Sequence, residues 1–63
     1  MAYYQAFKTL DRDVYCSSQT FKSHAPAAIW VADCMANFNI AANQLKGKPY
    51  EVDSQPAGAI IWP

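Results

Sequence analysis

Apolar residues recur at intervals of three and four between Ser23 and Lys46, and this spacing predicts one long helix. Pro26 suits the first helical turn, where its missing N–H is not needed, and Ser23 is the expected N-cap. Gly47 suits the left-handed position that ends many helices, and Pro49 blocks any continuation. We expect the core face of this helix to be the stripe formed by Ala28, Val31, Met35, Phe38, Ala42 and Leu45, widened by Ala27 and Cys34.

A second row lies on nearly the opposite side of the predicted helix and consists of Ile29, Asp33, Ala36 and Ile40, with Trp30 on its flank. One helix in so small a chain cannot bury both rows against the same sheet. Two interpretations stay open. The isoleucines are singly exposed, which is ordinary on protein surfaces, or the row is a contact surface for a partner or a second copy. Trp30 favours the contact surface, because tryptophan is enriched at interfaces.

Two segments before the helix read as strands. Residues 2–10 are rich in aromatics, and residues 14–21 combine β-branched, aromatic and hydroxyl side chains. Residues 11–13, Asp-Arg-Asp, supply turn chemistry through their aspartates. A hairpin with two or four loop residues would pair Phe7 with Cys16.

The chain after the helix shows one clear strand and one ambiguous segment. Residues 49–53 alternate, with Tyr50 and Val52 inward and the carboxylates outward. Residues 55–58, Gln-Pro-Ala-Gly, have the composition of a turn. Residues 59–63 are either a last short strand or an apolar tail that docks on the domain or on a neighbouring subunit, and both alternatives stay open.

These elements predict an α+β fold in a single domain, residues 1–63. We expect a small antiparallel or mixed sheet in the order β-β-α-β, with an optional further C-terminal strand and one long helix packed on one face. A chain this short buries only about 60% of its unfolded surface.

Composition adds a tendency to associate. The chain is 52% hydrophobic and 16% charged, with a formal net charge of zero, and near-zero charge favours association. No basic run is present, which argues against duplex nucleic acid as a partner. The longest apolar run, residues 25–32, is far shorter than the roughly 20 residues that span a bilayer. The first residues do not resemble a signal peptide. We therefore expect no membrane partner and a cytoplasmic location.

No pattern in the sequence predicts a reaction. Cys16, His24 and Cys34 are scattered singly, without the close pairs of a zinc site, so no metal is expected. The two cysteines are expected to be reduced, with a single disulfide as the alternative. The acidic pairs at residues 11 and 13 and at residues 51 and 53 lack a pocket that would shift their pKa values. We predict no catalytic residue and no cofactor.

The resulting hypothesis is a non-enzymatic protein-binding regulator, inhibitor or accessory subunit that is itself a homodimer. A phage or mobile-element origin would be in keeping with the chain's size. The candidate partner-binding residues are Ile29, Trp30, Asp33, Ala36, Ile40 and Trp62. The alternative hypothesis is a protein that binds a nucleotide-like ligand or metabolite at a subunit interface, lined by Trp30, Tyr50 and Trp62.

Overall fold

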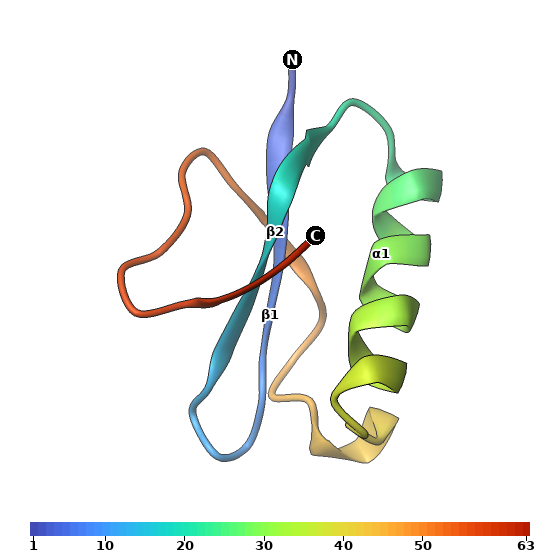
Figure 1. Ribbon diagram of the computed structural model, residues 1–63, viewed down its shortest axis with the longest axis vertical. Coiled ribbons are helices and arrows are strands. Elements are labelled where there is room, and N and C mark those ends of the chain that lie inside the picture. The colour runs from blue at the N-terminus through green and yellow to red at the C-terminus, as the bar shows by residue number, and fades with distance from the viewer.

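The computed structural model describes residues 1–63 as a four-stranded mixed sheet with one α-helix against one face (Figure 1). In chain order the elements are β1 (Tyr3–Lys8), β2 (Val14–Phe21), α1 (His24–Asn37), a 3-10 turn η1 (Ala42–Gln44), β3 (Tyr50–Val52) and β4 (Ile60–Trp62). The predicted α+β fold is confirmed. The ambiguous last segment forms a strand.

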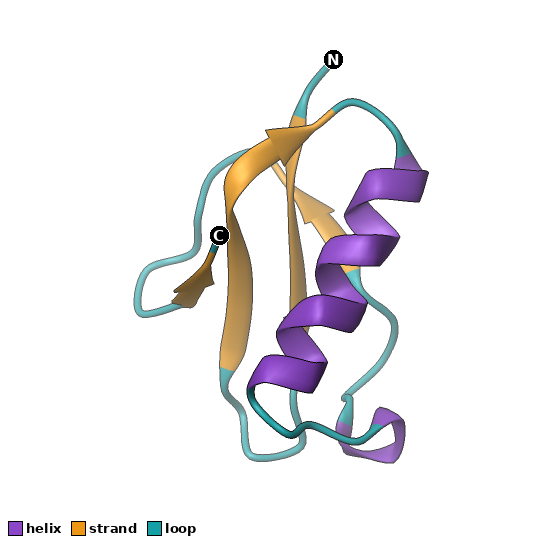
Figure 2. Ribbon diagram, turned by 45° about the vertical axis from the view of Figure 1, so that its right-hand side comes forward, coloured by secondary structure: helices purple, strands orange, loops and turns teal.

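The N-terminal hairpin lies in the middle of the sheet, and the two late strands lie on its edges. The strand order is β3-β1-β2-β4, with β1 antiparallel to both β2 and β3, and β4 parallel to β2. Figure 2 shows α1 lying across one face of this sheet. The connection from β3 to β4 passes on the other side, away from the helix (Figure 1). Ala6 and Cys16, which lie opposite each other in the hairpin, have no solvent exposure.

The hairpin register differs from the predicted one by a single residue. Phe7 lies opposite Tyr15, and Cys16 lies opposite Ala6. The difference comes from the loop, in which the Arg12 amide donates to the Thr9 carbonyl at 3.0 Å and Arg12 has a φ of 70°. A turn followed by a left-handed residue makes a three-residue loop. The predicted loops of two or four residues would shift the pairing by one.

A bulge interrupts the hairpin near its open end. Between the pairs formed by Tyr4 and Ala6, β1 has the single residue Gln5 whereas β2 has three residues. The buried Ser17 hydroxyl accepts a hydrogen bond from the Gln5 amide at 3.0 Å and donates to the Gln19 carbonyl at 2.7 Å. One side chain therefore replaces a hydrogen bond that the regular ladder would have supplied.

The helix ends earlier than the apolar pattern predicts. Its last residue is Asn37, and Asn39 adopts a φ of 56°. The Ile40 amide donates to the Met35 carbonyl at 2.8 Å, and the Asn39 amide donates to the Ala36 carbonyl at 3.4 Å. These two bonds form a Schellman motif with asparagine in place of the commoner glycine. The prediction of a helix reaching Lys46 was wrong because Asn39 supplies the left-handed stop.

The segment after the helix returns to the sheet without helical structure. Leu45 forms an isolated bridge with Thr9, and the Lys46 amide donates to the Lys8 carbonyl at 2.7 Å. Gly47, predicted to end the helix, has a φ of 82° in the connection to β3 instead.

The core lies between α1 and the helix-facing side of the sheet. Its buried members are Tyr3, Phe7, Tyr15, Phe21, Ala27, Trp30 and Cys34. The predicted core face was partly wrong, because Ala28 is exposed and Phe38 is 37% exposed, whereas Trp30 is only 3% exposed. Val31 and Met35 of the predicted stripe do pack against the core. The buried face is therefore rotated toward Trp30.

Candidate functional site

A shallow groove lies beside the outer face of α1, near the end of β4. It has a volume of about 220 Å³ and is lined by Gln19, Phe21, Pro26, Ile29, Trp30, Asp33 and Pro63. Phe21 and Trp30 are buried core residues, so the groove reaches down to the aromatic core. Ile29 is 64% exposed, and the Asp33 side chain is also in solvent. We call this feature the Ile29 groove.

The groove brings together three of the six predicted partner-binding residues, namely Ile29, Trp30 and Asp33. Ala36 is exposed on the same helix, close to its end. Ile40 does not belong to this row, because it follows the helix stop and packs partly against the core. The interpretation of Trp30 as a flanking surface residue was also wrong, since nearly all of its side chain is buried.

Trp62, the sixth predicted partner-binding residue, is hydrogen-bonded to Trp30. The Trp30 indole N–H donates to the Trp62 carbonyl at 2.8 Å, and the rings of Trp62 and Phe38 form a T-shaped pair with centres 5.7 Å apart. A free strand edge is a common site of unwanted pairing. Here β4 is three residues long, its last carbonyl is occupied by Trp30, and Pro63 has no N–H to offer. This edge is therefore poorly suited to adding another strand.

The residues of the predicted ligand site do not converge. Trp30 and Trp62 are in contact, but Tyr50 lies on β3, at the opposite edge of the sheet from β4. A single copy of the chain therefore does not bring these three residues to one ligand site.

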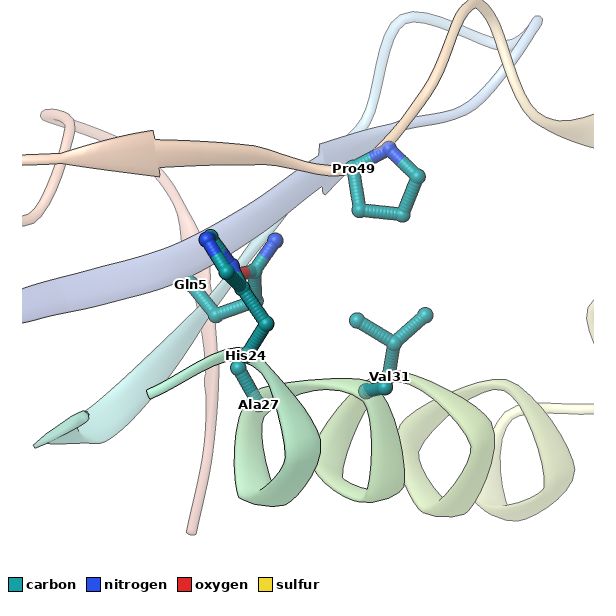
Figure 3. A pocket seen from close by; sticks show the side chains of 6 residues that line it. Gln5, His24, Ala27, Val31 and Pro49 are labelled. Atoms are coloured by element: carbon teal, nitrogen blue, oxygen red, sulfur yellow. The ribbon is translucent and has the colours of Figure 1, made fainter. Parts of the chain in front are cut away.

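A second hollow lies on the other side of α1, facing β1 and the approach to β3 (Figure 3). It has a volume of about 270 Å³ and is lined by Gln5, His24, Ala27, Ala28, Val31 and Pro49. Figure 3 shows the Gln5 side chain reaching from the sheet toward the helix, beside His24. We call this feature the Gln5 cleft.

The sequence reasoning missed this cleft, although a signal for it exists. Tyr3, Gln5 and Phe7 occupy alternate positions of one strand and therefore point to one face. Because Tyr3 and Phe7 belong to the core, Gln5 had to be a polar residue pointing inward. A buried amide requires hydrogen-bond partners, so it marks a place worth inspecting.

A third hollow, of about 380 Å³, opens at the hairpin loop and the end of the helix. Its lining is Thr9, Leu10, Asp11, Asp13, Tyr15, Phe38, Asn39, Ile40 and Gln44. Burial, reinforced by the nearby Asp13 carboxylate, raises the pKa of Tyr15 above its ordinary value. A phenol that holds its proton more tightly is a poorer nucleophile, so Tyr15 is not activated in this hollow.

The two cysteines are free and buried. Burial raises the pKa of the Cys34 thiol to about 11, and burial also raises the pKa of Cys16. The thiolate is the reactive form, so both residues are poor nucleophiles near neutral pH. His24 contacts the Tyr3 hydroxyl through Nδ1 at 3.3 Å, and no Cys–His pair is formed.

No group of three or more His, Cys, Asp and Glu side chains is placed to hold a metal ion. Neither α1 nor η1 has the length and hydropathy needed to cross a membrane. No protein-family model matches the chain, and neither the curated proteins nor the solved structures contain a significant match.

Proposed function

We propose that this chain is a small non-enzymatic protein that works by binding another protein, as a regulator or accessory subunit, and that it also associates with itself. The binding surface is the Ile29 groove together with the adjoining outer face of α1. The observation that carries the proposal is a large apolar side chain, Ile29, exposed above a groove that reaches the aromatic core.

The composition of α1 supports this surface. Asp33 is the only residue with a formal charge among its 14 residues, and the rest of its exposed side is mainly alanine. Interface centres are depleted of charged residues. A helix face that only meets water usually carries more charge than this one.

The energetic contribution of Ile29 can be bounded. Complete burial of such a side chain stabilises by about 1.5–3 kcal/mol, so covering its exposed part contributes roughly 1–2 kcal/mol. Because 1.4 kcal/mol is a factor of ten, losing this contact raises Kd by about five- to thirtyfold. The carboxylate of Asp33 beside it favours a partner with a positive charge at the rim.

Self-association is proposed from the zero net charge and the exposed apolar side chain of Ile29. Sedimentation equilibrium over a hundredfold concentration range tests it. We expect a reversible dimer, and a wild-type chain that stays monomeric over that range contradicts this part of the proposal.

The groove itself is tested with Ile29→Asp and the matched variant Ile61→Asp. Ile61 is also exposed, but it lies on β4, paired with Cys16, whereas Ile29 lies on α1. We expect Ile29→Asp to weaken dimerisation, and capture of a protein from the native host, at least tenfold with an unchanged circular dichroism spectrum. Ile61→Asp should leave both unchanged. Equal effects of the two variants would show that the Ile29 groove is not the binding surface.

A further inference from the structure

The Gln5 cleft presents a hydrogen-bond acceptor whose identity is fixed by chemistry. Gln5 is only 6% exposed, and its Nε2 donates to the Tyr50 carbonyl at 3.2 Å. A carbonyl can only accept, so the amide nitrogen must face Tyr50. Oε1 makes no hydrogen bond within the chain, and no fully buried polar side-chain atom lacks a partner. Oε1 is therefore open to the cleft.

His24 also lines the cleft, and its imidazole carries a second acceptor. The Tyr3 hydroxyl donates its single proton to the Ser23 carbonyl at 3.1 Å. With that proton on the Ser23 carbonyl, the phenol oxygen is left as the acceptor for a proton on His24 Nδ1, 3.3 Å away. In the neutral imidazole the proton is consequently on Nδ1, and Nε2 carries a lone pair.

Among the strand residues on the helix-facing side of the sheet, the one charged residue is Glu51. Glu51 lies directly opposite Gln5 in the pairing of β1 with β3, and directly opposed side chains project from the same face. The Glu51 charge, after burial, is a cause of the raised pKa of Tyr3, so its field reaches this end of the sheet. No Lys or Arg lines the cleft. The positive end of the α1 dipole opposes a cation here. The Glu51 carboxylate acts against this effect and favours a positively charged occupant.

The remaining walls are apolar and the volume is small. Ala27, Ala28, Val31 and Pro49 offer only hydrocarbon to an occupant. The cleft volume of about 270 Å³ is just below the range of roughly 300–1,000 Å³ for pockets that take drug-sized ligands. The occupant must therefore be small, with an apolar stem.

We propose that the Gln5 cleft binds a primary alkylammonium group. Its N–H donors bond to Gln5 Oε1 and His24 Nε2, its charge faces Glu51, and its methylene stem lies on Val31 and Pro49. The group is carried either by a free small amine or by a lysine side chain. This site is separate from the Ile29 groove, because it is on the other side of the helix, and it does not depend on the proposed protein-binding function.

The test is an NMR titration of the ¹⁵N-labelled full chain with n-butylammonium at neutral pH. We expect saturable shifts at the Gln5 side-chain amide and at the backbone amides of Ala27 and Val31. Kd should be on the order of 1–10 mM, as suits five heavy atoms. Butyrate and n-butanol are the matched probes, and both should bind at least tenfold more weakly. Absence of saturable shifts, or equal binding of butyrate, overturns the proposal.

Two exposed carboxylates provide matched variants that remove the same charge without disturbing the core. Glu51→Gln should weaken n-butylammonium binding at least threefold, whereas Asp33→Asn, on the other side of α1, should leave it unchanged. Equal responses would refute the assigned role of Glu51. A blocked Ala-Lys-Ala peptide identifies the source of the group: tighter binding than n-butylammonium indicates a lysine side chain, and weaker binding indicates a free amine.

Discussion

The buried Ser17 hydroxyl should be one of the most sensitive single groups in the fold. Ser17→Ala removes one oxygen atom and leaves the rest of the side chain in place. In the native chain that oxygen accepts from the Gln5 amide at 3.0 Å and donates to the Gln19 carbonyl at 2.7 Å. Gln19 is exposed, so water can replace the bond to its carbonyl. The buried Gln5 amide has no such replacement.

The expected loss of stability follows from the Gln5 backbone N–H, which would be left without a partner. A buried donor left without a partner costs about 1–3 kcal/mol. The vacated space is too small to hold a water molecule that could restore the bond. We therefore expect Ser17→Ala to lower the free energy of unfolding by about 2 kcal/mol, which corresponds to a Tm decrease of roughly 8–16 °C in a domain of this size. This is a large share of the roughly 3–9 kcal/mol typical of such a chain.

Urea unfolding followed by tryptophan fluorescence measures the change, since Trp30 is buried and Trp62 is half-buried. Ser18→Ala is the matched control, because the neighbouring serine is exposed and the chemical change is the same. That variant should stay within about 0.5 kcal/mol of the native chain. If the two variants unfold at the same urea concentration, the hydroxyl does not hold the bulge and the reasoning is refuted.

Three further measurements probe the core. Trp30→Phe keeps an aromatic ring but loses the hydrogen bond to the Trp62 carbonyl. We expect the free energy of unfolding to fall by about 2 kcal/mol and amide hydrogen exchange in β4 to become faster. Unchanged exchange in β4 would argue against the contact. Cys34 is fully buried, and its pKa is about 11 against an ordinary 9.0. Labelling at neutral pH should therefore be at least a hundredfold slower than for a free cysteine, and both thiols should label fully in urea. As the pH rises, the folded Cys34 thiol keeps its proton after the unfolded thiol has lost it, so the free energy of unfolding should fall between about pH 9 and 11. Urea midpoints at pH 8 and 10.5 measure this change. A midpoint that does not fall contradicts the linkage.

The sequence predicted the strands well because each has a simple local pattern. Alternation located β3, and the aspartates located the hairpin loop to within one residue. The predicted orientation of β3 was wrong. Glu51 lies opposite Gln5 and so faces the helix, whereas Tyr50 and Val52 point to the other face of the sheet. The parallel pairing of β4 with β2 could not be predicted, since it depends on which edge of the hairpin the returning chain reaches.

The prediction of the helix end was wrong for a specific reason. Phe38 and Leu45 continue the helical spacing, but they dock from a turn and a loop that happen to return to the same core. Spacing alone cannot separate a longer helix from this arrangement. The local signal was Asn39, because asparagine is the residue after glycine that most readily adopts a left-handed conformation.

The candidate sites were predicted only in part. Ile29 and Asp33 are exposed together, as expected of one helix face. The position of Trp30 was misjudged, because its long side chain reaches the core from a flank that a helical wheel assigns to solvent. The Gln5 cleft depends on contacts across more than forty residues of sequence, such as that of Gln5 with Tyr50, which no local pattern encodes.

The placement of both late strands outside the early hairpin has a consequence for the order of assembly. The hairpin pairs residues that are close in sequence and so can form first, but its two edges stay open until Ala6 meets Tyr50 and Tyr15 meets Ile60. Such distant pairings slow folding. During that interval the central strands are the part of the chain most exposed to pairing with another molecule, so conditions that delay closure should promote aggregation through the hairpin rather than through the helix.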